Sequence, residues 1–308
     1  MGSLLARGLE AVARRSDRRL GIALVYHRVG DPAGLLEREL LPALGSALFR
    51  SHMRYLASRY RVVPASELFA AAQERRRGDR FPVAVTLDDD LRSHVEVAAP
   101  VLQSAGVTAT FFVSGGSLHA PRRFWWERLQ AAVDRGLDLS WLGLPAAGAD
   151  IHHLARAVEA LPPGERDDVD ARLERLVGQD PPEAGLRADE IRLLAHSGFE
   201  IGFHTLRHYN LLALPAEKLE AALREGRTEI EQVIGRPLRV IAYPHGAADG
   251  RVAFAAKAAG FQFGFSGQDE PVSPEADPLL LGRLSPSYDS VGELAFSIAR
   301  TLVAASGR

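Results

Sequence analysis

The amino-acid sequence predicts an α/β protein built on a parallel sheet. Short, continuously apolar runs alternate with helical patterns along most of the chain. Such runs are typical of parallel strands covered on both faces, and the alternation is typical of βα units. The polar residues of interest follow directly after predicted strands. In α/β barrels the chemistry lies at this end of the strands.

The elements follow one another in a regular order. Glycines at 106, 198, 235 and 260 end four of the predicted helices, in agreement with the preference of helix C-termini for glycine. Strands are predicted over residues 21–26, 61–63, 81–87, 109–113, 199–203, 238–242 and 261–265, and helices over 48–60, 94–105, 191–196, 214–234 and 252–259.

The alternation of strand and helix patterns is interrupted between about residues 117 and 187. This stretch contains an aromatic trio, residues 124–126, and charged helical patterns punctuated by proline pairs. We interpret it as a mostly helical insertion in one domain spanning residues 1–308. Because tryptophan is usually buried, the trio is interpreted as a packing anchor rather than a sugar platform.

Composition excludes several classes of protein. The formal net charge of −2 gives no electrostatic signature of nucleic-acid binding, and the absence of cysteine excludes disulfides and thiolate ligands. The sequence predicts no membrane span. Residues 1–19 lack the apolar core of a signal peptide, which predicts a cytoplasmic protein. Their basic amphipathic pattern predicts a helix lying on the domain, with peripheral membrane contact as the alternative.

Two motifs suggest a metal site. Asp88 and Asp89 end the strand over residues 81–87, so one carboxylate can bind a metal while its neighbour faces a bound water. An Asp at this place can also serve as a helix N-cap. His204 and His208 follow another strand at i, i+4 spacing, which suits a divalent transition metal. Together they make a three-ligand site with an open position, typical of catalytic metals.

The motifs resemble those of the polysaccharide deacetylases, carbohydrate esterase family 4. Residues 86–90 (Thr-Leu-Asp-Asp-Asp) are similar to the family's Thr-Phe-Asp-Asp-Gly, and residues 204–208 (His-Thr-Leu-Arg-His) to its His-Ser/Thr-x-x-His. The flanking stretches 106–113 and 198–202 resemble the family's strands. The resemblance covers roughly residues 20–266 apart from the insertion. It implies a distorted (β/α)7-type barrel.

The resemblance also implies roles for individual residues. Asp88 would be the general base, and Asp89, His204 and His208 would hold a divalent ion. Zn²⁺ is the expected ion, with Co²⁺, Ni²⁺, Fe²⁺ or Mn²⁺ as alternatives. The third motif would correspond to Tyr243, Pro244 and His245, where the backbone N–H after the proline helps to hold the oxyanion and the substrate.

The sequence departs from the family pattern in three places. Asp90 replaces the first motif's glycine, and this residue either keeps a left-handed turn or intrudes on the metal. Ala242 stands where the third motif usually has an arginine that tunes the base. Near the C-terminus, residues 279–284 offer Arg283 where the family has its acid histidine.

A circularly permuted branch, similar to poly-N-acetylglucosamine deacetylases, takes that histidine from an N-terminal strand. His27 ends the strand over residues 21–26 and fits this pattern. It is therefore the candidate general acid, the alternative being a buried structural histidine.

The predicted function is metal-dependent hydrolysis of the N-acetyl group of an amino sugar, which yields acetate and a free amine. Its substrate would be an N-acetylated carbohydrate: a polysaccharide, an oligosaccharide or a glycan intermediate. Two alternatives stay open, hydrolysis of a linear or cyclic non-sugar amide and sugar binding without catalysis.

Overall fold

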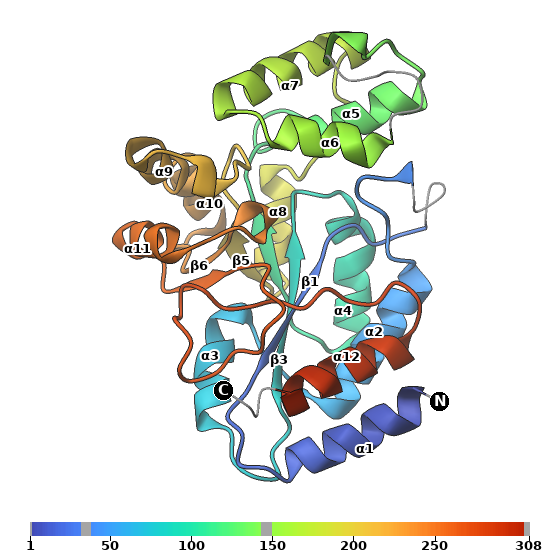
Figure 1. Ribbon diagram of the computed structural model, residues 1–308, viewed down its shortest axis with the longest axis vertical. Helices are drawn as coiled ribbons and strands as arrows, with labels where there is room; N and C mark the ends of the chain where they lie inside the picture. Colours follow the sequence, from blue (N-terminus) through green and yellow to red (C-terminus); the bar gives the residue numbers. More distant parts are fainter. Residues whose placement is uncertain (1, 32–37, 143–149, 305–308) are drawn as a thin grey trace.

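A single curled, fully parallel sheet forms the centre of the molecule (Figure 1). The computed structural model describes residues 2–31, 38–142 and 150–304. The strand order is β1-β3-β4-β5-β6-β7, with β2 paired to β3. The strands are β1 (Ile22–Tyr26), β2 (Arg61–Val62), β3 (Pro82–Asp88), β4 (Thr110–Val113), β5 (Glu200–Phe203), β6 (Val240–Ala242) and β7 (Phe263–Phe265).

The last part of the chain joins the two edges of this sheet. Phe265 of β7 forms a parallel bridge with Leu281, and Leu24 of β1 forms another with Leu284. The segment over residues 281–284 therefore lies between β7 and β1, and the sheet curls into a distorted barrel. The predicted barrel of alternating β and α elements is thus confirmed.

Most helices follow a strand and cover the outside of the sheet. They are α2 (Ser46–Arg59), α3 (Ala65–Glu74), the π-helical η2 (His94–Ala98) continuing into α4 (Ala99–Ala105), α8 (Ala188–His196), α9 (Ala216–Ala222), α10 (Arg227–Ile234), α11 (Gly250–Ala258) and α12 (Val291–Ala304). Short 3-10 turns lie at η3 (Ser140–Leu142), η4 (Leu211–Ala213) and η5 (Pro244–Gly246).

The single helix predicted over residues 214–234 is wrong in one respect. It is two helices, α9 and α10, because Gly226 between them takes a left-handed φ of 76° that interrupts helical hydrogen bonding.

In strand β5 a glycine is required by packing. A Cβ on Gly202 of β5 would lie 2.4 Å from Cδ1 of Phe112, so only glycine lets that ring fill the barrel interior.

The predicted insertion is helical and sits over one end of the barrel (Figure 1). It contains α5 (Trp125–Asp134), α6 (Ile151–Glu159) and α7 (Pro163–Val177). These helices enclose a small apolar core of their own, to which Trp125, Trp126, Leu129 and Leu173 contribute. The aromatic trio therefore does act as a packing anchor, although Trp126 has a second contact described below.

The N-terminal helix α1 (Gly2–Arg14) packs against α12 at the opposite end of the molecule (Figure 1). Glu10 fixes it in place through an ion pair with Arg59, at 2.8 Å, and a hydrogen bond accepted from Tyr60. The predicted helix lying on the domain is thus confirmed. Across the described residues, no helix combines the length and apolar character that crossing a membrane would need.

Candidate active site

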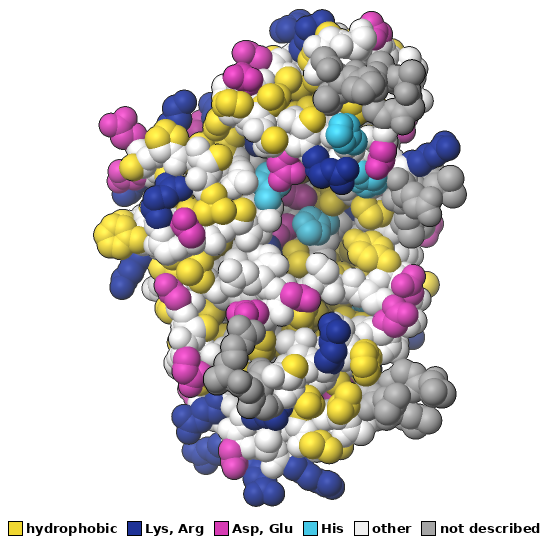
Figure 2. All heavy atoms as spheres, viewed as in Figure 1, with side chains coloured by type: hydrophobic (Ala, Val, Ile, Leu, Met, Phe, Trp, Pro, Cys, Tyr) yellow, Lys and Arg dark blue, Asp and Glu magenta, His cyan; other side chains and the backbone are white. Residues whose placement is uncertain are grey.

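The polar residues that follow strands meet at one edge of the barrel. Because all strands are parallel, their carboxyl ends lie on the same side. Asp88 ends β3, His204 follows β5, and His27 follows β1. Figure 2 shows histidine side chains gathered in the hollow between the barrel and the insertion.

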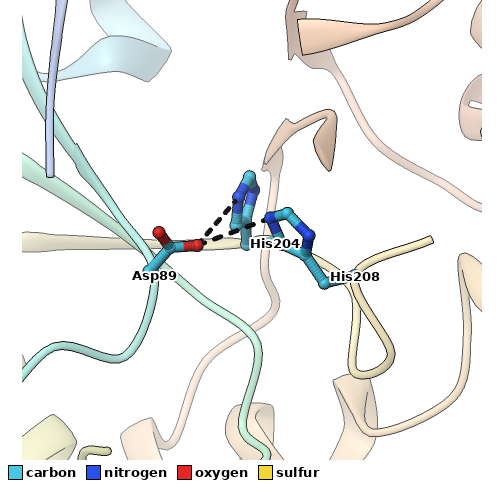
Figure 3. A group of neighbouring side chains, drawn as sticks. All are labelled: Asp89, His204 and His208. Carbon is cyan, nitrogen blue, oxygen red and sulfur yellow. Dashed lines mark ion pairs between the residues drawn. The ribbon is translucent and has the colours of Figure 1, made fainter. Parts of the chain in front are cut away.

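Asp89, His204 and His208 form a compact cluster (Figure 3). The Nε2 atoms of both histidines lie 3.5 Å from Oδ1 of Asp89. Two ligands held at about 2.1 Å around a tetrahedral ion are separated by roughly this distance. All three side chains are buried. The three predicted metal ligands are therefore brought together with suitable spacing.

The chemistry of these groups fits a cation. Oδ1 of Asp89 is buried and has no hydrogen-bond partner. Burial and the carboxylates of Asp88 and Asp90 raise the pKa of Asp89 well above its ordinary value. Burial lowers the pKa of His204 to about 4 and that of His208 well below its ordinary value. The imidazoles are neutral, as metal ligands must be, and the carboxylate lacks a counter-charge.

A hydrogen bond also orients the first histidine. Nδ1 of His204 lies 2.8 Å from the carbonyl oxygen of Ala242, so Nδ1 carries the proton and Nε2 faces the cluster. Ala242 replaces the arginine of the family's third motif, and its backbone carbonyl fixes the orientation of the His204 ring.

Backbone strain is concentrated at the same edge. Within the described parts of the chain, the non-glycine residues with positive φ are Asp89 (72°), Thr205 (57°), His208 (48°) and His245 (58°). Such conformations persist where the surrounding structure imposes them, and they cluster at functional sites. Each of the four is a proposed site residue or lies in the loop between His204 and His208.

Asp88 is held by a residue that the sequence motifs did not assign. Arg283 donates two hydrogen bonds of 2.7 Å to its two carboxylate oxygens, and both side chains are buried. Burial alone would raise the pKa of Asp88. The guanidinium of Arg283 and the nearby His204 outweigh burial and lower this pKa to about 2. Asp88 thus has an arginine partner from a different segment, although Ala242 stands where the family's third motif has its arginine.

His27 lines the same cavity as the cluster and Asp88. Burial lowers its pKa, an effect that Asp88 partly offsets. Its backbone carbonyl is 3.2 Å from Nε2 of His94, a buried histidine that supports this end of β1. His27 therefore shares a cavity with Asp88 and the Asp89, His204 and His208 cluster, and its role as the acid stays a prediction.

The carboxylate of Asp90 is turned away from the cluster. It accepts hydrogen bonds from the backbone N–H and hydroxyl of Ser114, at 2.7 and 2.6 Å, and from the N–H groups of Gly115 and Gly116. The expectation that Asp90 adopts a left-handed turn is wrong, because the positive φ belongs to Asp89. Asp90 instead ties the end of β3 to the loop after β4.

The third motif contributes mainly its last residue. Tyr243 is buried and donates a hydrogen bond of 2.8 Å to the carbonyl of Leu279, and neither Tyr243 nor Pro244 lines the cavity. Of the three motif residues, His245 is the one that faces the cavity. Its backbone N–H donates no hydrogen bond in the described structure. Its Nδ1 lies 2.8 Å from Oε1 of Glu159 in the insertion.

A cavity of about 440 Å³ opens in front of these groups. Its floor is formed by the barrel edge and one wall by the insertion, through Trp125, Trp126, Ala155 and Glu159. Ligand cavities are commonly of this size.

Comparison with known proteins gives one family match. Residues 167–264 match the family model described as polysaccharide deacetylase. This segment includes His204, His208 and the third motif, and it excludes Asp88, Asp89 and His27. A search of curated protein sequences gives no match to this chain.

Several solved structures share the fold. The deacetylase PplD of Streptococcus pyogenes, solved in complex with acetate, is 14% identical with a TM-score of 0.63, over 92% of this chain and 98% of that one. IcaB from Ammonifex degensii is 18% identical with a TM-score of 0.61, over 92% and 98%. A de-N-acetylase from Aggregatibacter actinomycetemcomitans is 18% identical with a TM-score of 0.58, over 89% and 98%.

The family match and the shared fold confirm the predicted resemblance to the polysaccharide deacetylases. The circularly permuted arrangement stays a prediction.

Proposed function

We propose that the protein is a metal-dependent deacetylase that removes the N-acetyl group from an amino sugar. The observation that carries the proposal is the buried cluster of Asp89, His204 and His208 beside the paired carboxylate of Asp88. The family match supports a carbohydrate substrate.

Asp89, His204 and His208 would hold the divalent ion, for which Zn²⁺ is the expected species. When bound there, such an ion would supply Lewis-acid polarisation of the acetamide carbonyl and a lowered pKa for a water molecule.

Asp88 is the proposed base. Its Oδ2 lies 4.0 Å from Nε2 of His204, next to the cluster where the attacking water would sit. Arg283 keeps the carboxylate ionised and fixed in orientation. A carboxylate has about four acceptor sites, so the two hydrogen bonds from Arg283 leave room for the proton of water.

His245 and His27 complete the proposed reaction. The unbonded backbone N–H of His245 would donate to the oxyanion that forms when water adds to the carbonyl carbon. His27 would give a proton to the sugar nitrogen as the C–N bond breaks, so that the amine does not leave as an anion. The products are acetate and the free amino sugar.

The experiment that tests this function is an acetate-release screen of the Zn²⁺-loaded protein. It covers N-acetylglucosamine oligomers, sugar nucleotides and small N-acetyl glycosides, with N-acetyl amino acids and a cyclic ureide as non-sugar amides. The proposal expects acetate from at least one sugar, and release slower on the order of 10²-fold or more in Asp88→Asn. Turnover of the non-sugar amides alone would replace it with the amidase alternative. Sugar binding without any acetate would favour the non-catalytic one.

A further inference from the structure

The two histidines of the proposed metal site are supported in different ways. His204 is anchored by the barrel, because its Nδ1 is bonded to the carbonyl of Ala242. Nδ1 of His208 is buried and has no hydrogen-bond partner. A ligating histidine normally has its orientation fixed through its second ring nitrogen. Some other contact must therefore position His208.

That contact comes from the insertion. Arg166, near the start of α7, is buried and directs its guanidinium at the loop carrying the ligand. Nη1 donates to the carbonyl of His208 at 2.8 Å, and Nη2 donates to the carbonyl of Arg207 at 2.6 Å. Its Cζ also lies 4.4 Å from the ring centroid of Tyr209. One side chain thus holds three consecutive residues, the first two through charge-assisted hydrogen bonds.

The backbone that Arg166 holds is strained. His208 has a φ of 48°, a conformation that a bulky side chain rarely adopts. In an extended or right-handed conformation, the carbonyls and the imidazole would point in other directions. The hydrogen bonds from Arg166 favour the conformation that turns the His208 ring toward Asp89.

The insertion packs against the ring itself as well. The ring centroid of Trp126 lies 4.6 Å from that of His208, and the centroid of Phe124 lies 5.6 Å away. Neither residue contacts His204 in this way. The His208 ring also meets that of His245, with centroids 4.7 Å apart. The insertion therefore contacts both the backbone and the ring of one ligand.

We propose that the helical insertion completes the metal site, with Arg166 as the positioning residue for His208. The inference rests on the proposed function, since it assumes that the cluster binds a metal. It gives the insertion a role beyond that of a cavity wall. Because linkage is reciprocal, metal binding should in turn stabilise the docking of α7 on the barrel.

The test measures Zn²⁺ affinity by competition with a chromophoric chelator in three proteins: the wild type, Arg166→Met and Arg172→Met. Arg172 is the matched control, because it lies on the same helix but is exposed, with its Cζ 4.1 Å from the Trp141 ring centroid. Loss of such a support typically weakens metal affinity about 10–100-fold. We expect this loss in Arg166→Met and wild-type affinity in Arg172→Met.

Two further measurements separate positioning from general destabilisation. Arg166→Lys keeps the positive charge and can donate to one of the two carbonyls, so it should recover part of the Zn²⁺ affinity. If Arg166→Met does not fold, the comparison of Arg166→Lys with the wild type is the test. Hydrogen exchange of α7 should slow on addition of Zn²⁺ in the wild type, and slow less in Arg166→Lys. Wild-type Zn²⁺ affinity in the Arg166 variants would overturn the inference. Failure of the wild type to bind any divalent ion would instead overturn the proposed function.

Discussion

The ion pair between Asp88 and Arg283 allows a quantitative test of how the proposed base is held. The two side chains share two hydrogen bonds of 2.7 Å, and their side-chain exposures are only 2% and 3%. Arg283→Met leaves a buried carboxylate without its counter-charge, and Asp88→Asn leaves a buried guanidinium without one. Removing one partner of such a pair costs about 3–5 kcal/mol of unfolding free energy.

The double variant should lose much less than the sum of the two single variants, because neither charge is then left unpaired. We expect a coupling free energy of about 2 kcal/mol or more. The exposed i, i+4 pair of Arg224 and Glu220 is the matched control. Its coupling should be no more than about 0.5 kcal/mol, because solvent screens charges at that exposure.

Urea unfolding of the four metal-free proteins of each cycle, followed by circular dichroism, gives these free energies. Acetate release should fall in both single variants, and Arg283→Lys should recover part of it, since lysine keeps the charge without the fork geometry. Additive single effects on stability at Asp88 and Arg283 would show that the pair is not coupled. The role assigned to Arg283 would then be refuted.

Three other residues give further predictions. His27→Ala should slow deacetylation of an N-acetyl sugar on the order of 10²-fold and hydrolysis of an activated aryl acetate much less; equal losses on both substrates, with a lower melting temperature, would favour a structural histidine. Asp90→Gly restores the residue of the family's motif, but it should lower the unfolding free energy by about 2–4 kcal/mol, because the hydrogen bonds to the loop after β4 are lost. Since it also removes a charge that acts on Asp89, Zn²⁺ affinity should fall, although much less than in Asp89→Ala. A variant as stable as the wild type would contradict this role of Asp90. Burial lowers the pKa of His52 from 6.5 to about 4, so the unfolded chain binds more protons between these values and stability falls as the pH drops from 6.5 to 4. Urea unfolding at pH 7 and 4.5 should therefore show roughly 2–3 kcal/mol less acid destabilisation in His52→Gln than in the metal-free wild type, and identical pH profiles would contradict this account.

The sequence alone allowed the alternating architecture and the grouping of Asp89, His204 and His208 to be predicted. The buried strands are largely apolar, and several run directly into a polar residue, as β3 does at Asp88 and β5 at His204. Parallel pairing then brings those ends together regardless of how far apart they are in the chain. The i, i+4 spacing of His204 and His208 survives as a close pair, although a left-handed turn and not a helix joins them.

Arg283 could not be assigned because its position depends on long-range topology. The segment over residues 281–284 makes only isolated bridges, and it is too short to give a strand signal. A clue was present, since Arg283 is flanked by leucines at 281 and 284 in an otherwise apolar stretch. An arginine in such a setting usually has a buried partner.

Arg166 gave even less signal. It lies in a highly charged helix whose pattern is that of a solvated surface, and its partners are backbone carbonyls about 40 residues away. Its nearest acid, Asp167, lies 3.9 Å away on the same helix and gives no sign of the loop that Arg166 holds. The left-handed φ expected at Asp90 lies at Asp89 for a related reason. Asp90 accepts hydrogen bonds from N–H groups of the loop after β4, and this contact cannot be read from the local sequence.

The most direct test of the central claim compares Asp88→Asn with Asp89→Ala for zinc content and acetate release. The wild type should hold about one ion per chain and release acetate from an N-acetyl sugar. Asp88→Asn should keep its zinc and lose acetate release on the order of 10²-fold or more, whereas Asp89→Ala should lose both. Zinc retained in Asp89→Ala, or lost in Asp88→Asn with Asp89 intact, would contradict the assignment of ligand and base.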